Sequence, residues 1–195
     1  GMRRMSDEQE DVFYYLTVMN ENYPQPALPE GAEEGILRGL YLLREGAADA
    51  TQRVQLLGSG AILREVLAAA DLLEGDFQVT ADVWSVTSFT ELRRDGLESE
   101  RWNRLHPVEQ PRQAYVQAAL QGRAGPFVAA TDYMRAFADQ IRPFVPGSYT
   151  VLGTDGFGRS DYRVKLRSFF EVRMMDVLMS RTLVQRLRIR CFLKF

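Results

Sequence analysis

Apolar runs of two kinds alternate along most of this chain, and their spacing predicts an α/β fold. Short runs typical of strands, rich in β-branched and aromatic residues, lie at 54–57, 82–89, 127–131 and 149–152. A segment with apolar residues at helical spacing follows each run, at 61–73, 90–97, 134–141 and 161–170. Because strand and helix alternate four times, the pattern indicates a sheet between two layers of helices.

The helical segments carry further local signals. In 61–73 the inner face is expected to hold Leu63, Val66, Leu67, Ala70 and Leu73. Thr90 is a candidate cap for the helix over 90–97, and 100–105 and 113–120 predict further helical pieces on either side of the break at His106 and Pro107.

The first fifty residues have a different pattern. VFYYLTV at 12–18 is β-branched and aromatic and predicts a buried strand. Pro24, Pro26 and Pro29 then predict a stiff, extended connector. From Glu30 the apolar positions recur at helical spacing, which predicts a short helix to about Leu43.

Composition narrows the class of protein. With 195 residues and 46% apolar residues, the chain can bury a full core without disulfides or metal. It has one cysteine, Cys191, and no apolar stretch long enough for a membrane span. The opening Gly1 and Met2 are typical of a cleaved expression tag, and the charged residues after them do not resemble a secretory signal. We therefore expect a cytoplasmic protein.

The net charge of −2 hides an asymmetry along the chain. Residues 173–195 hold six basic side chains against one aspartate, net +5, which leaves net −7 for residues 1–172. A basic tail can contact nucleic acid or acidic partners, but such a run is more often a solvated face. Apolar and polar residues alternate from Leu187 to Phe195, which predicts a half-buried strand that pairs with a sheet edge of its own chain or of another copy.

Two glycine-rich junctions are the candidate functional sites. Gly58, Ser59 and Gly60 join a predicted strand to a predicted helix, a place where backbone N–H groups can hold a phosphate. The third glycine of the dinucleotide fingerprint and the lysine of a P-loop are both missing. A structural turn is therefore favoured over an anion site.

The second junction, VLGTDGFGRSD at 151–161, ends a strand, turns on glycines and starts a helix. Its candidate residues for an anion site or a structural junction are Asp155, Gly156, Gly158, Arg159 and Ser160. Arg159 can bind a polar ligand with its neighbours or close an ion pair within the loop. Ser160 with Asp161 is the expected helix cap, and Gly158 is expected at a backbone conformation closed to other residues.

The remaining residues do not favour a hydrolytic triad or a zinc site. His106 is the single histidine, and no Gly-x-Ser-x-Gly elbow surrounds a serine. A zinc site needs more His and Cys ligands than the chain has. We expect His106 to be a turn residue bonded to backbone, and Trp84, Phe89 and Trp102 to be packing residues.

Five long motifs, taken in order, are more specific than any single signal. They are NENYPQPALPEGAEEGI, VQLLGSGAILREV, DVWSVTSFTELRRDGLESERWNRLHP, ATDYMRAFADQIRPFVP and YTVLGTDGFGRSD. From about Val12 to Val172 the chain resembles the carboxy-terminal part of the first, decarboxylating component of bacterial pyruvate dehydrogenase complexes, the homodimeric type. After Val172 the sequence departs from that family's pattern.

The resemblance implies a three-layer α/β/α sandwich with a mostly parallel sheet of about five strands, of the transketolase C-terminal-domain type. In that family thiamine diphosphate and Mg²⁺ bind through segments that precede the part resembled here. The implied parent oxidatively decarboxylates pyruvate and acetylates the lipoyl group of the acetyltransferase component. This chain is then a structural, dimer-supporting domain with no catalytic, cofactor or metal residue, and with no membrane or nucleic-acid partner.

The same resemblance divides the chain into four parts. Residues 1–11 are a tag remnant and lead, 12–50 end the middle domain and connect it, 51–172 are the C-terminal-like domain, and 173–195 are the divergent basic tail. Two alternatives stay open: a free-standing nucleotide-binding α/β domain that uses Gly58, Ser59 and Gly60, and a binding domain whose basic tail engages nucleic acid or a protein.

Overall fold

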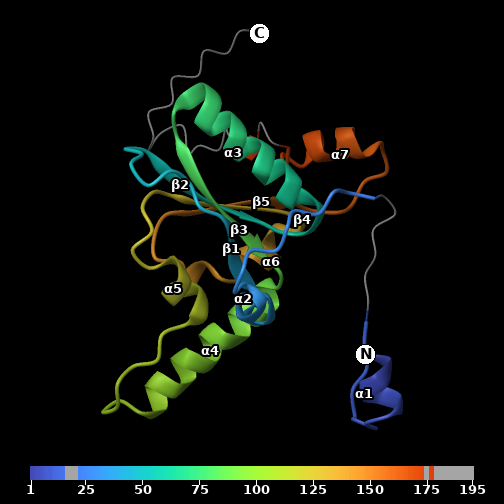
Figure 1. The fold of residues 1–195 in the computed structure, drawn as a ribbon, viewed down its shortest axis with the longest axis vertical. Coiled ribbons are helices and arrows are strands. Elements are labelled where there is room, and N and C mark those ends of the chain that lie inside the picture. Colours follow the sequence, from blue (N-terminus) through green and yellow to red (C-terminus); the bar gives the residue numbers. More distant parts are fainter. Residues whose placement is uncertain (16–21, 174–175, 178–195) are drawn as a thin grey trace.

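A five-stranded sheet forms the centre of the fold in a computed structural model that describes residues 1–15, 22–173 and 176–177 (Figure 1). The strands are β1 (Leu40–Arg44), β2 (Arg53–Gly58), β3 (Thr80–Val86), β4 (Phe127–Met134) and β5 (Tyr149–Thr154). Their order is β1-β3-β2-β4-β5; β1 pairs antiparallel with β3 and the other neighbours are parallel. The predicted α/β fold with a mostly parallel sheet is confirmed.

Helices cover both faces of this sheet. The helices of the described residues are α1 (Met2–Ser6), which lies apart from the sheet in Figure 1, α2 (Glu33–Arg38), α3 (Leu63–Phe77), α4 (Phe89–Leu105), α5 (Tyr115–Leu120), α6 (Arg135–Asp139) and α7 (Arg163–Phe169), with 3₁₀ turns η1 (Gly60–Ile62) and η2 (Arg142–Phe144). Figure 1 shows α3 and α7 on one side of the sheet and α4, α5 and α6 on the other. The architecture therefore has three layers.

Adjacent strand residues supply the two halves of the core. Leu56 and Leu57 are both fully buried, but successive side chains of a strand point to opposite faces. Leu56 joins the apolar cluster under α3, whereas Leu57 joins the cluster under α4, α5 and α6. Val83 and Trp84 on β3 divide in the same way. Burial on both faces explains why these strands read as continuous apolar runs.

The segment after the proline connector differs from the prediction. A helix to about Leu43 was expected, but α2 ends at Gly39, whose φ of 98° stops it, and Leu40 begins strand β1. The amide groups of Thr87 and Ser88 donate to the Gly39 carbonyl over 3.0 and 3.2 Å, and Leu40 pairs with Val86. Pairing with β3 thus outweighs the helical spacing, and the sheet extends N-terminal of residue 51.

Helix α4 also departs from expectation. It runs unbroken from Phe89 to Leu105, so the two predicted pieces at 90–97 and 100–105 are one helix. Its cap is Ser88 and not Thr90: Ser88 has an extended backbone, and its hydroxyl accepts the Glu91 amide over 3.1 Å. Ser88 with Glu91 is a capping-box pattern, which is the signal that the prediction overlooked.

The remaining corrections concern the chain ends. Helix α7 begins at Arg163, with Tyr162 as its N-cap and no side-chain cap, so Ser160 and Asp161 do not cap it. The strand expected at 12–18 is absent from the described residues 12–15, where Phe13 and Tyr15 are largely exposed. Residues 16–18 and the strand predicted at 187–195 lie outside the described residues.

Candidate functional site

The carboxyl ends of the parallel strands define the edge of the sheet where ligands are most often bound in α/β folds. The crossover from β2 to β3 carries α3, and the crossover from β3 to β4 passes to the other face. The strand order therefore reverses between β2 and β4, which is the topological switch point. The predicted Gly58-Ser59-Gly60 turn lies at that point.

The hydroxyl and the amide of Ser59 in this turn already form hydrogen bonds within the protein. The buried Ser59 hydroxyl donates to Thr131 Oγ1 over 2.8 Å, and the Ser59 amide donates to the Ala130 carbonyl over 3.2 Å. Gly60 has a φ of 55°, and a Cβ there would lie 3.3 Å from the Asp132 carboxylate. An exposed carboxylate so close to the turn disfavours an anion in the same place.

A cavity of about 420 Å³ opens beside the turn and is the space that a ligand at the switch point would use. Ser59 and Gly60 line one side, the cap of α4 with Ser88 lines another, and Tyr133 and Phe137 close it. Hydroxyl groups and aromatic rings thus dominate its walls. The choice between a structural turn and an anion site at Gly58, Ser59 and Gly60 stays a prediction.

The second predicted junction lies elsewhere on the same edge. Asp155 pairs with Arg135 over 3.2 Å, and Gly156 adopts the left-handed backbone with a φ of 86°. The conformation expected for Gly158 is therefore found at Gly156 instead. Of the two roles left open for Arg159, the ion pair within the loop is not formed among the described residues, and its guanidinium stacks 4.6 Å from the Phe169 ring centre.

Gly158, Arg159 and Ser160 line a separate hollow of about 540 Å³ with Lys165 and Phe169. The structure therefore does not bring the two predicted groups into one site. Asp161, which was expected to cap α7, accepts the adjacent Tyr162 amide over 2.7 Å. The anion role of this loop also stays a prediction.

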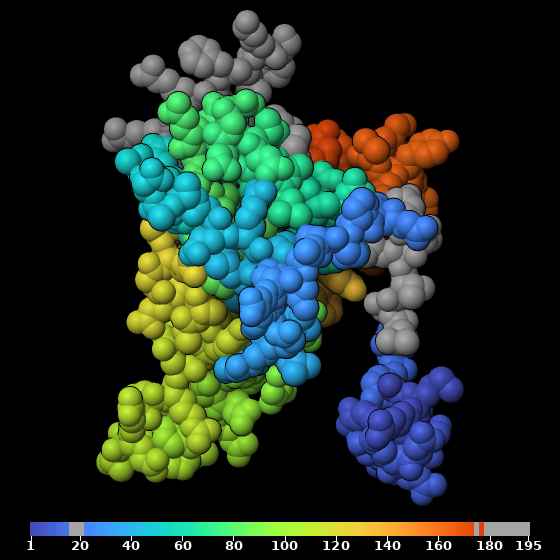
Figure 2. Space-filling model, in the orientation of Figure 1, coloured from blue at the N-terminus to red at the C-terminus, as the bar shows by residue number. Residues whose placement is uncertain are grey.

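One feature of the connector was missed from the sequence. Tyr23 lies between two arginines: the Arg64 guanidinium sits 4.6 Å from its ring centre, and Arg163 donates to its hydroxyl. Pro24 and Pro26 follow it over the start of α3, and Figure 2 shows this segment lying on the surface of the molecule. Tyr23 therefore fixes the connector to α3 through a cation–π contact and to α7 through a hydrogen bond.

The expected roles of His106, Trp84 and Phe89 are confirmed, whereas Trp102 is half-buried and belongs to neither core cluster. His106 Nδ1 lies 2.8 Å from the Trp102 carbonyl oxygen, and the two rings stack with centres 4.4 Å apart. Trp84 and Phe89 are buried in the core. Within the described ranges, no three His, Cys, Asp or Glu residues gather as metal ligands would. A search of the same residues finds no helix with the length and apolarity that a bilayer crossing requires.

Several known proteins are similar to this chain in sequence. It is 65% identical over 173 residues to the pyruvate dehydrogenase E1 component of Pseudomonas aeruginosa, covering 88% of this chain and 20% of the relative. The E1 components of Cupriavidus necator and Escherichia coli K12 are 61% and 56% identical, over 88% of this chain and 19% of each relative. The chain thus spans about a fifth of their length.

Solved structures agree on the fold. A transketolase variant from Pichia stipitis superposes with a TM-score of 0.53 at 19% identity, covering 87% of this chain and 20% of that one. Transketolase from Leishmania mexicana gives 0.50 at 18% identity, with 80% and 18% covered. The sequence profile described as "Transketolase-like TK C-terminal domain" matches residues 39–173. This chain therefore belongs to the transketolase-like C-terminal domain family.

Proposed function

We propose that this chain is the C-terminal domain of a pyruvate dehydrogenase E1 component and serves that enzyme as a structural, dimer-supporting domain. The observation that carries the proposal is the 65% identity over 173 residues to one such component. Transketolases of known structure share the fold at under 20% identity, so the fold alone does not choose between the two enzymes. The high identity favours the pyruvate dehydrogenase type.

In this proposal the parent enzyme oxidatively decarboxylates pyruvate and passes the acetyl group to the lipoyl group of an acetyltransferase component. It works as a cytoplasmic homodimer that consumes the pyruvate made by glycolysis. Thiamine diphosphate with Mg²⁺ supplies the carbanion chemistry there. The proposal assigns binding of that cofactor to parts of the parent other than this domain.

The residues described here do not fit a diphosphate–Mg²⁺ unit. At the switch point the Ser59 hydroxyl is bonded to Thr131, and Asp132 is a lone carboxylate beside the glycine turn. A magnesium diphosphate needs several oxygen ligands for the metal as well as N–H groups for the phosphates. No step of the reaction is therefore assigned to this domain.

A domain exchange tests the proposal. Residues 22–173 would replace the matching segment of the Pseudomonas aeruginosa E1 component, and NADH formation would be measured with the acetyltransferase and lipoamide dehydrogenase components. We expect the rate of NADH formation to stay within about tenfold of the parent enzyme's rate. A tenfold loss corresponds to about 1.4 kcal/mol of transition-state stabilisation. A control exchange would insert the C-terminal domain of a transketolase, which is expected to give no NADH. If both exchanges are equally inactive although both proteins are dimeric, the assignment is wrong.

The two alternatives from the sequence predict ligands for the isolated chain. A ligand at a hundredfold excess over its dissociation constant stabilises a protein by about 2.7 kcal/mol. Thermal unfolding of the full chain with NAD, ATP or DNA would therefore show a clear shift if either alternative held. We expect no shift with these ligands or with thiamine diphosphate and Mg²⁺.

A further inference from the structure

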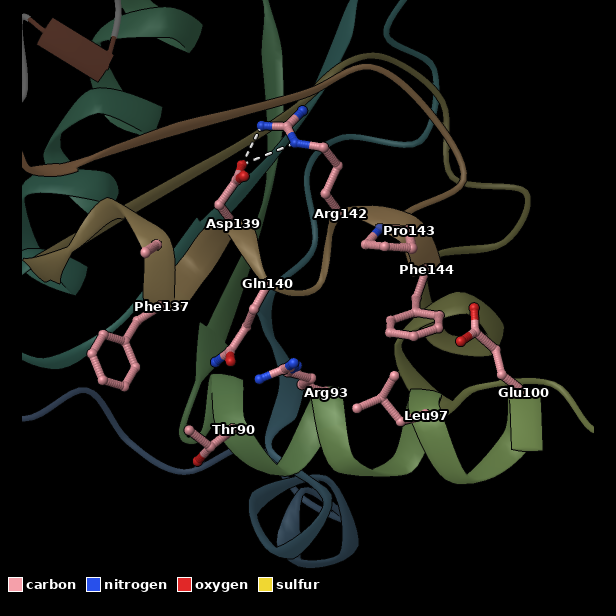
Figure 3. A pocket seen from close by; sticks show the side chains of 11 residues that line it. Thr90, Arg93, Leu97, Glu100, Phe137, Asp139, Gln140, Arg142, Pro143 and Phe144 are labelled. Atoms are coloured by element: carbon pink, nitrogen blue, oxygen red, sulfur yellow. Dashed lines mark hydrogen bonds and ion pairs between the residues drawn. The ribbon is translucent and has the colours of Figure 1, made fainter. Parts of the chain in front are cut away.

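A cavity of about 780 Å³ lies between helix α4 and the α6–η2 segment (Figure 3), next to the switch-point cavity, with which it shares Thr90 and Phe137. This volume is within the range of pockets that bind small molecules. One part of its wall is polar, with Thr90, Arg93 and Gln140, and another part is apolar, with Leu97 and Phe144. The cavity thus has separate places for a polar and an apolar group of one ligand.

Two hydrogen-bond donors in this cavity are unused. The Gln140 Nε2 atom is buried and has no hydrogen-bond partner among the residues that the structure describes. Arg93 makes no ion pair or hydrogen bond with the residues the structure describes, whereas the next residue, Arg94, pairs with both Glu91 and Glu98. Figure 3 shows the Arg93 guanidinium and the Gln140 amide close to each other in the cavity. The buried Gln140 donor without an acceptor costs free energy, and a half-turn of its amide group brings the N–H₂ group toward the exposed Arg93 guanidinium. The two side chains are then suited to an acceptor from outside.

The acidic residues of the cavity cannot serve as that acceptor. Asp139 accepts from Arg142 Nε over 2.9 Å and is already engaged, as the dashed lines in Figure 3 show. Glu100 lies on the far side of Leu97 and Phe144 from Arg93 in the same view. Its charge repels an anion from the apolar end, so the negative group of a ligand is directed toward Arg93.

We propose that this cavity binds an organic carboxylate whose carboxylate group lies between Arg93 and Gln140 and whose apolar group packs on Leu97 and Phe144. A guanidinium together with one amide supplies donors for the two oxygens of a carboxylate. The apolar wall distinguishes this class from inorganic anions, which would leave Leu97 and Phe144 uncovered. The residues that form the cavity all belong to this chain, so the site needs neither the proposed parent enzyme nor its cofactor.

Titration of the ¹⁵N-labelled full chain with phenylacetate, acetate and inorganic phosphate tests the proposal. The side-chain amide resonances of Gln140 report directly on the site. We expect saturable shifts with phenylacetate, and at least about tenfold weaker binding of acetate and phosphate, the ratio that 1.4 kcal/mol produces. Arg93→Gln should weaken phenylacetate binding by about the same factor. Arg101→Gln, an exposed arginine on the same helix that does not line the cavity, should leave binding unchanged.

Gln140→Glu is the second variant, because it keeps the shape of the side chain but places a negative charge beside the ligand. It should abolish phenylacetate binding while amide spectra show that the fold is kept. Three results would overturn the proposal: no saturable shift with phenylacetate, equal affinity for phenylacetate and phosphate, or unchanged binding in a folded Gln140→Glu protein. The last result stands even if Arg93→Gln fails to fold.

Discussion

Asp82 is a carboxylate with no solvent exposure, and replacing it with alanine should destabilise the fold more than any surface change. Its Oδ1 accepts the Gly46 amide over 2.9 Å, and its Oδ2 accepts Gln55 Nε2 over 2.7 Å. Arg53 donates to it directly, and the Arg123 guanidinium lies 3.7 Å away. The network continues to Trp84, whose indole N–H donates to Gln55 over 2.8 Å.

The magnitude follows from how these groups are buried. Removing one partner of a buried ion pair costs about 3 to 5 kcal/mol, because the other charge stays desolvated. The Arg53 side chain is 14% exposed and Arg123 is 30% exposed, so water can relieve part of that cost. We therefore expect Asp82→Ala to lose about 3 to 4 kcal/mol. At about 2 to 4 °C per kcal/mol for a domain of this size, the melting temperature should fall by roughly 6 to 16 °C.

This loss can be measured by urea unfolding, with far-UV circular dichroism as the signal. The dependence of the unfolding free energy on urea concentration should be the same in both proteins. The matched control is Asp71→Ala, which removes the ion pair of Arg44 with a 67% exposed aspartate at 2.6 Å. An exposed pair contributes about 0 to 1 kcal/mol, so the control should change little. A loss below about 1 kcal/mol for Asp82→Ala, similar to the control, would refute the reasoning, because the buried network would then carry no net stability.

Three further predictions, made with five substitutions, can be checked in the same unfolding assay. Gly96→Ala should destabilise the fold by about 1 to 3 kcal/mol, because its Cβ would lie 2.4 Å from the Phe144 ring. Gly75→Ala should stabilise it by about 0.5 to 1 kcal/mol, because its Cβ would meet no described atom beyond its own stretch of helix within 4 Å. Ser88→Ala should lose about 0.5 to 2 kcal/mol with the cap of α4, but Ser160→Ala should lose less than about 0.5 kcal/mol because it caps nothing. Burial raises the pKa of the Tyr149 hydroxyl above its ordinary 10.0. As the pH rises, the unfolded chain therefore loses this proton at a lower pH than the folded protein does. Stability should then fall as the pH rises above about 10, and Tyr149→Phe should make this fall shallower; equal slopes for both proteins would contradict it.

The central strands could be predicted because burial on both faces makes them distinctive. Leu56 and Leu57 are consecutive apolar residues that face opposite halves of the core, and this pattern identified β2 without further information. The edge strand β1 could not be found in this way. Its residues also have helical spacing, and only the pairing of Leu40 with Val86, distant in the chain, makes them a strand.

Helix starts were harder to predict because several residues near each start can act as a cap. Ser88 and Thr90 both carry hydroxyl groups, and the extended backbone of Ser88 decides between them. At α7 the carboxylate of Asp161 bonds to the adjacent amide, which leaves the helix to begin later at Arg163. At α4 the capping-box spacing of Ser88 and Glu91 would have identified the cap from the sequence, whereas the start of α7 depends on backbone angles that no such pattern reveals.

The candidate sites also depend on contacts between residues that are distant in the chain. The sequence located a glycine turn at the switch point, where α/β folds often bind ligands, but the Ser59 hydroxyl there is bonded to Thr131 and Asp132 brings a negative charge. Arg93 and Gln140 carry no motif and lie 47 positions apart, so their approach depends on the packing of α4 against α6. Because unsatisfied donors are costly inside a protein, a buried amide without an acceptor is stronger evidence of a ligand than a favourable place in the topology. The cavity beside α4, and not the glycine turn, is therefore where a ligand of this domain should be sought first.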